Sequence, residues 1–172
     1  EAVMTDRLVD IVDEGFDALL RTGDIQDQRL IARPLAPLRW VTVASPAYLA
    51  RFGTPQTVEE LQDHNCLTVR NLRSGRLVDW QFTREGKVRD VSVEGRLIFD
   101  IGDALVDGAV GGFGIAQVMD FAVREDLAAG RLVPLLEDFA GRSRALSLVY
   151  PPSRQYSPKL MAFAEALSRA QW

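Results

Sequence analysis

The sequence has 172 residues, of which 47% are hydrophobic and 26% charged, and its formal net charge is −4. This length fits one ordinary domain or two small lobes, and the acidic balance argues against a surface that grips nucleic acid by its phosphates. A single cysteine, Cys66, excludes an internal disulfide. No apolar run approaches the ~20 residues of a membrane span, and no signal peptide is visible.

Helix and strand signals alternate along the first part of the chain, as they do in α/β domains. Residues 5–15 carry apolar side chains at helical spacing and predict a helix, with Asp6 as a candidate cap and Gly15 as a candidate stop. Ser45 caps a second predicted helix, which begins at Pro46. Strands are predicted over 16–23, 29–35 and 39–44, with a break at Ala36-Pro37.

The middle of the chain predicts a short helix, a hairpin and a helix that ends in glycines. Thr57 and Glu60 have the spacing of a capping box. Glu85-Gly86 predicts the turn of a hairpin that runs on into a further strand. Further strands are predicted over 66–69, 114–119, 132–136 and 144–151. Further helices are predicted over 101–110, 120–130 and 157–170, the last with an apolar stripe of Leu160, Phe163, Ala164 and Leu167.

The glycine run of Gly111, Gly112 and Gly114 follows the carboxyl end of the predicted helix 101–110. Carbonyl groups and the negative end of the helix dipole lie there, so an anion is repelled. The run therefore favours a Schellman-type stop with a left-handed glycine. A phosphate loop is the weaker interpretation, because no Lys-Ser or Lys-Thr pair and no GxGxxG spacing is present.

Three helix starts are candidates for ligand contact. They are Thr5-Asp6, Ser45-Pro46 and the residues 100–102. In open α/β sheets, ligands lie at strand ends where free helix N–H groups converge. Each junction by itself is an ordinary helix start, and the spacing does not show that the three converge.

No catalytic or metal-binding group is predicted. His64 and Cys66 are two residues apart, and because the chain has no other histidine or cysteine, a closed zinc site would need carboxylates to complete it. We interpret Cys66 as a small buried residue and His64 as a loop or capping residue. The serines lack a nearby general base. For an enzyme on this scaffold, Asp100 is the best remaining titratable candidate.

Taken in series, "ASPAYL", "H-x-CL" and "YPPSRQYSPK" resemble the effector-binding domain of LysR-type transcriptional regulators. The segments "DRLVDIVDEGFDALLRTG", "GAVGGFGIAQV" and "DLAAGRLVPLL" extend the resemblance in order over nearly the whole chain. The resemblance implies a sensing function without catalysis, metal or cofactor.

The resemblance also implies a fold like that of type 2 periplasmic binding proteins. Two Rossmann-like α/β lobes are then joined by crossover strands near 38–44 and 145–150. The first lobe would contain 1–38 and 144–172, and the second lobe 39–143. A small effector would bind in the cleft between the lobes.

In this family, effectors contact helix starts of both lobes and one strand of the second. Organic acids are one candidate class of effector, although Asp100 and Asp103 beside a helix start would weaken its attraction for a carboxylate. The positions of this sequence that match the family's effector contacts are Thr5, Asp6, Ser45, Pro46, Asp100, Ile101, Gly102, Gly114, Ile115 and Ala116.

The resemblance further implies a cytoplasmic homo-oligomer, dimeric or tetrameric, that touches DNA only through an upstream winged helix-turn-helix and does not touch membranes. Family domains begin with another strand and helix before the segment that matches Glu1, and we expect this chain to lack them, which would leave the pocket and the dimer contact incomplete. The alternatives are a periplasmic solute-binding protein of a transport system and an enzyme.

Overall fold

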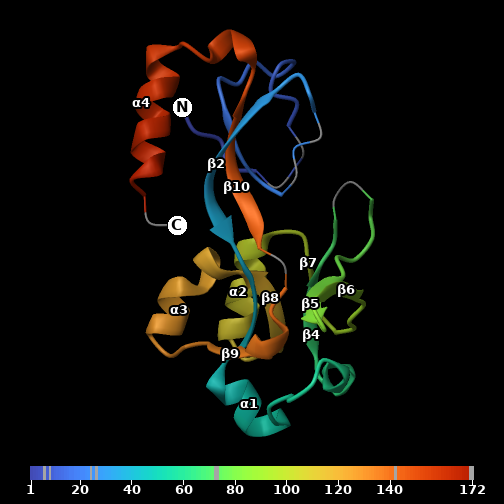
Figure 1. Ribbon diagram of the computed structural model, residues 1–172. Coiled ribbons are helices and arrows are strands. Elements are labelled where there is room, and N and C mark those ends of the chain that lie inside the picture. The colour runs from blue at the N-terminus through green and yellow to red at the C-terminus, as the bar shows by residue number, and fades with distance from the viewer. Residues whose placement is uncertain are drawn as a thin grey trace. The chain divides into compact units, whose positions relative to one another are not determined.

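The structure, a computed structural model, describes residues 1–5, 7, 9–23, 25, 27–71, 74–141 and 143–170. The α/β chain divides into two compact units, shown with their elements in Figure 1. Unit 1 contains Glu1–Arg7 and Arg39–Arg142, and unit 2 contains Leu8–Leu38 and Ser143–Trp172. The backbone therefore passes between the units three times: after Arg7, after Leu38 and before Ser143.

Unit 1 is built on a five-stranded mixed sheet in the order β7-β4-β8-β3-β9. β4 is parallel to β7 and β8, whereas β3 is antiparallel to β8 and β9. The strands of this sheet are β3 (Trp40–Ala44), β4 (Cys66–Val69), β7 (Ile98–Phe99), β8 (Ile115–Met119) and β9 (Val133–Leu135). The predicted hairpin is confirmed as β5 (Trp80–Arg84) and β6 (Lys87–Val91).

Three α-helices accompany this sheet: α1 (Pro46–Phe52), α2 (Gly102–Val110) and α3 (Arg124–Ala128). Two of the predicted helices are shorter than expected. Half of the Thr57–Glu60 capping box forms: the Glu60 N–H donates to Thr57 Oγ1 at 3.4 Å, whereas the Glu60 carboxylate accepts the Gln56 N–H at 2.8 Å. The pair precedes only a 3₁₀ turn, Glu59–Asp63. The helix predicted over 120–130 consists of a 3₁₀ turn, Asp120–Val123, followed by α3.

Two apolar clusters cover the opposite faces of the sheet, because successive strand residues point to opposite sides. The cluster that includes α2 contains Val43, Leu67, Leu105, Val106, Ala109, Ala116, Val118, Val123 and Leu132. The cluster that includes the hairpin contains Ala44, Tyr48, Leu61, Cys66, Trp80, Phe82, Val93, Ile115 and Leu135. α2 and the hairpin therefore pack on different faces.

Gln117, only 6% exposed, joins the hairpin to the sheet. Its side-chain oxygen accepts the Gln81 N–H at 2.8 Å, and its side-chain nitrogen donates to the Gln81 carbonyl at 3.0 Å. One amide thus satisfies both backbone groups of a β5 residue, as a neighbouring strand would.

The predicted glycine stop after α2 is confirmed. Gly112 has a φ of +77°. Its N–H donates to the Ala109 carbonyl at 3.1 Å, and the Phe113 N–H donates to the Gly108 carbonyl at 3.1 Å. This is the paired hydrogen bonding of a Schellman motif, which turns the chain toward β8.

Two further glycines allow backbones to pass at the base of β4. A Cβ on Gly114 would lie 2.2 Å from the Asn65 carbonyl oxygen, and a Cβ on Gly95 would lie 1.9 Å from the Cys66 carbonyl oxygen. No side chain fits at these distances, so the requirement for glycine is steric.

Unit 2 contains the antiparallel sheet β1-β10-β2 and the helix α4 (Pro158–Ser168) (Figure 1). Its strands are β1 (Leu19–Thr22), β2 (Ile31–Leu38) and β10 (Arg144–Tyr150). Leu148, Leu160 and Ala164 form the buried cluster between α4 and the sheet. Two expectations were wrong. Phe163 of the predicted apolar stripe is 47% exposed. β2 also continues through Pro37. Its irregularity is a register shift between Leu146 and Ser147 of β10, which leaves Leu35 of β2 without a Cα partner.

The helix predicted over 5–15 is also wrong. Its described part contains one turn, in which the Glu14 N–H donates to the Asp10 carbonyl at 3.0 Å. Gly15, with a φ of +73°, ends this turn as predicted. Asp6 and Leu8, which belonged to the predicted helix, lie outside the described residues.

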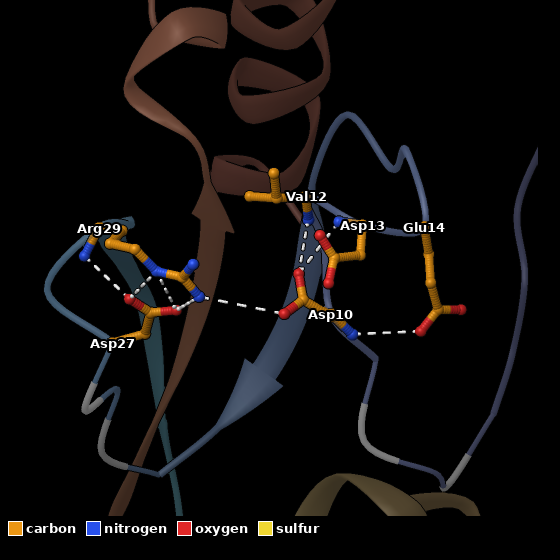
Figure 2. A network of polar contacts seen from close by, with 6 residues as sticks. All are labelled: Asp10, Val12, Asp13, Glu14, Asp27 and Arg29. Atoms are coloured by element: carbon orange, nitrogen blue, oxygen red, sulfur yellow. Dashed lines mark hydrogen bonds and ion pairs between the residues drawn. The ribbon is translucent and has the colours of Figure 1, made fainter.

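Asp10 explains why the helical turn begins late. Its carboxylate accepts the N–H groups of Val12 at 3.0 Å and Asp13 at 3.1 Å, and the Glu14 carboxylate accepts the Asp10 N–H at 3.2 Å (Figure 2). These are the bonds of an N-cap, and a short acidic side chain that makes them starts a helix instead of continuing one.

Arg29 ties this turn to the segment before β2, as Figure 2 shows. Its guanidinium bonds Asp27 through Nε at 3.0 Å and Nη2 at 2.8 Å, and Nη2 lies 3.9 Å from Asp10. The hydrogen bonds from Arg29 lower the pKa of Asp27 to about 2.

We predict that Gly114→Ala lowers the free energy of unfolding by about 1–3 kcal/mol or more, because the new Cβ meets backbone. Gly102→Ala is the matched control: no atom lies within 4 Å of its Cβ position, so its stability should stay equal or rise by up to about 1 kcal/mol. Urea unfolding followed by tryptophan fluorescence measures both. Equal stability of the two variants would contradict the steric argument.

A pH prediction follows from the Asp27–Arg29 pair. Because the pKa of Asp27 is lowered from 3.8 to about 2, the pair stabilises the folded state above pH 3.8 and loses this effect as the pH falls through about 2. The difference in urea midpoint between the wild type and Asp27→Asn should shrink over that interval. The effect will be small, since the pair is exposed. A difference that grows on acidification would oppose the assignment.

Candidate functional site

The start of α2 is open. β7 ends at Phe99, and Ile101 is the extended N-cap residue, with φ −127° and ψ 131° and no side-chain hydrogen bond to the helix start. Ile101 is 51% exposed, and Asp100 and Gly102 are exposed beside it. Free N–H groups at the positive end of a helix dipole, following a parallel strand, form the usual ligand position of an open α/β sheet.

Ile101, and neither Asp100 nor Asp103, is the N-cap residue of this helix, and it makes no side-chain capping bond. Both carboxylates are exposed, and Asp103 lies in the first turn. Their negative charge opposes the positive helix end, so the site attracts an anion less than the helix dipole alone would.

The start of α1 is closed. Ser45 is 3% exposed, and its Oγ accepts the Tyr48 N–H at 3.3 Å, which confirms the predicted cap. Pro46 occupies the first helical position and has no N–H to offer. A Cβ on Gly112 would lie 3.3 Å from Ser45 Oγ, so the Gly112 backbone packs against the cap.

Gly114, Ile115 and Ala116 are packing residues. Gly114 passes against the Asn65 carbonyl. Ile115 and Ala116 are fully buried and contribute to the two different clusters. Their side chains face the interior of unit 1.

The structure separates the two helix starts of unit 1. β4 begins at Cys66, which pairs with Ile115 at the end of the sheet where β3 finishes. β4 finishes at Val69, which pairs with Phe99 at the opposite end of the sheet. Ser45 lies at the first end and Asp100–Gly102 at the second. α2 runs between them, and its nine residues span about 14 Å at ~1.5 Å per residue. The two junctions are therefore separated by about the length of α2.

Of the remaining predicted pair, Thr5 is exposed and its Oγ1 accepts the Arg7 N–H at 3.3 Å. Asp6 lies outside the described residues.

The interpretations of His64 and Cys66 are confirmed. His64 ends the 3₁₀ turn Glu59–Asp63, and its Nδ1 lies 3.2 Å from the Tyr48 hydroxyl. Cys66 is buried, and burial raises the pKa of its thiol to about 12. Within the described part of the chain, no group of three or more His, Cys, Asp and Glu residues is placed to hold a metal ion.

The principal residue that sequence reasoning missed is Asn65. Its backbone N–H donates to the Tyr48 hydroxyl at 3.0 Å, and its carbonyl accepts the Ile115 N–H at 3.0 Å. Its side chain bonds Arg96 and Phe113. No periodicity or motif marks this asparagine in the sequence, because its partners lie up to 48 residues away.

The surface has two hollows among the described residues, one in each unit. One, in unit 2, has a volume of about 340 Å³ and lies beside Pro34–Pro37 and Ser143. The other, in unit 1, has a volume of about 300 Å³ and lies between Thr54–Gln56 and Pro134–Phe139. No predicted effector residue lines either one.

The fold is that of a type 2 periplasmic-binding-protein-like regulatory domain. It matches the regulatory domain of CrgA, a LysR-type regulator of Neisseria meningitidis, with a TM-score of 0.80 and 31% identity over 91% of this chain and 76% of that chain. It also matches full-length AphB, the Vibrio cholerae virulence activator, with a TM-score of 0.82 and 27% identity over 98% of this chain and 56% of that chain.

The family described as LysR substrate binding domain matches residues 1–172. A putative transcriptional regulator of Pseudomonas aeruginosa is 38% identical over 159 residues, which are 92% of this chain and 52% of that protein. The chain belongs to the LysR substrate-binding domain family. It spans about half the length of such relatives.

The relatives are transcriptional regulators, and the comparisons give no support to the transport alternative. The family is one of regulators and not of enzymes. Among the residues that the structure describes, no helix is both long and apolar enough to cross a membrane.

We predict that Cys66 does not react with a thiol reagent such as DTNB at pH 8 in the folded chain, because it is buried and burial raises the pKa of its thiol to about 12. In 8 M urea the same assay should titrate one thiol per chain. Rapid reaction of the folded chain would show that Cys66 is accessible.

Proposed function

We propose that this chain is the small-molecule sensing domain of a bacterial LysR-type transcriptional regulator that acts in the cytoplasm. The observation that carries the proposal is the family match over residues 1–172, together with the fold shared with CrgA. The DNA-binding winged helix-turn-helix would belong to the part of the longer protein outside this chain. The acidic balance of the chain agrees with that division of labour.

Unit 1 and unit 2 would correspond to the two regulatory lobes of an effector-binding domain. In unit 1 we assign the contact to Asp100, Ile101 and Gly102. The uncapped start of α2 and its exposure support this assignment. Thr5 and Asp6 remain candidate contacts. Ser45, Pro46 and Gly114–Ala116 would hold the fold of unit 1 without touching the effector.

The effector would act by shifting an equilibrium between two arrangements of a homo-oligomer. To do so it must bind one arrangement more tightly than the other. The shift would change how the DNA-binding domains are spaced on their half-sites. The domain would perform no chemistry on its ligand.

The direct test is a thermal-shift screen of the full-length regulator against metabolites and organic acids, followed by isothermal titration of each hit. We expect at least one compound to raise the melting temperature and to change the affinity for promoter DNA, because a ligand that binds the folded state stabilises it. Compounds that bind without altering DNA affinity would count against a sensing role, and so would the absence of any hit.

The charges at the start of α2 yield a second prediction. Asp100→Asn and Asp103→Asn should each tighten binding of a carboxylate effector about two- to fivefold at low salt, because each removes a negative charge beside the helix start. High salt should reduce this gain. Asp107→Asn, an exposed change farther along α2, is the control. Isothermal titration measures the affinities, and equal effects of all three substitutions would contradict the assigned contact.

A further inference from the structure

One side chain holds both ends of the segment that carries the start of α2. Asn65 Oδ1 accepts the Arg96 N–H at 2.7 Å, and Asn65 Nδ2 donates to the Phe113 carbonyl at 2.5 Å. Arg96 precedes β7, and Phe113 follows α2. Residues 96–113 therefore form a loop that a single carboxamide closes at its base.

Backbone hydrogen bonds also hold the chain just before Arg96 and just after Phe113. The Cys66 N–H donates to the Glu94 carbonyl at 3.1 Å, and the Ile115 N–H donates to the Asn65 carbonyl at 3.0 Å. Gly95 and Gly114 each pass too close to residues 65 and 66 to carry a Cβ. Both ends of the loop therefore contact the same two residues, Asn65 and Cys66, at the start of β4.

Asn65 itself is held in place. Its N–H donates to the hydroxyl of Tyr48, and Tyr48 is buried in the apolar cluster that includes the hairpin. The N–H and the carbonyl of Asn65 are therefore both bonded, and this fixes the position from which its carboxamide holds the loop.

We propose that Asn65 is a positioning residue for the effector contact at Asp100–Gly102. The inference rests on the proposed function, because it assigns a role toward that site. α2 lies between Ile101 and Phe113, and a helix transmits a shift of one end to the other. With the Phe113 end bonded to Asn65, α2 holds its place along the sheet and so sets where its free N–H groups point.

The test uses two substitutions that distinguish the oxygen of the carboxamide, which accepts from Arg96, from its nitrogen, which donates to Phe113. Asn65→Asp keeps an acceptor for Arg96 but loses the donor to Phe113, whereas Asn65→Ala loses both. The reporter of the α2 start is the Leu105 amide, whose N–H donates to the Ile101 carbonyl at 3.3 Å. Val133→Ala is the control. Val133 lies in β9 and packs against the apolar cluster that includes the hairpin, so this substitution destabilises unit 1 away from α2.

Native-state hydrogen exchange of the chain is measured by NMR, with urea added so that all variants have equal global stability. We expect Leu105 to exchange at least about tenfold faster in both Asn65 variants than in Val133→Ala, since each loses the hydrogen bond at the end of α2. The Arg96 amide should stay protected in Asn65→Asp and lose protection in Asn65→Ala.

The proposal is overturned if Leu105 exchanges no faster in the Asn65 variants than in Val133→Ala. It is also overturned if only Arg96 responds. Because no ligand enters this measurement, its result is independent of the effector screen: a failed screen would leave the positioning of α2 intact, and unchanged exchange would leave the sensing function intact. Once an effector is known, Asn65→Asp should weaken its affinity more than Val133→Ala does.

Discussion

The closure of the β7–α2 loop on Asn65 is the constraint on which the organisation of unit 1 depends. Three segments meet there: the approach to β7, the turn after α2 and the start of β4. The two glycines permit the close approach of the backbones, and the carboxamide of Asn65 bonds Arg96 on one side and Phe113 on the other. Leu105, Val106 and Ala109 hold α2 on its face of the sheet, and the closure on Asn65 fixes the carboxyl end of the helix along it.

Local patterns predicted much of the fold because local bonds determine it. The Ser45 cap, the left-handed Gly112 and the Thr57–Glu60 box each depend on residues within a few positions of one another. The alternation of helix and strand signals predicted the α/β class for the same reason. Such features need no knowledge of the tertiary structure.

What the sequence did not predict depends on long-range pairing. β3 is antiparallel to β8, so the helix start that follows β3 lies at the opposite end of the sheet from the one that follows β7. A candidate site that joined Ser45 to Ile101 could not foresee this. Asn65 and Gln117 were missed because a side-chain amide acquires such a role only from partners that are distant in the sequence. The failed helix over 5–15 had the right periodicity, but the capping bonds of Asp10 outweighed it.

Unit 1 therefore has an open end, at the start of α2, and a packed end, at the start of α1. We infer that a small ligand contacts only the open end, and chemical-shift mapping of a bound effector on ¹⁵N-labelled full-length protein is the sharpest test. The amides of Asp100–Asp103 should shift on binding, while those of Ser45, Gly112 and Ile115 stay unchanged. Shifts centred on Ser45 and Gly112, with residues 100–103 unaffected, would contradict it.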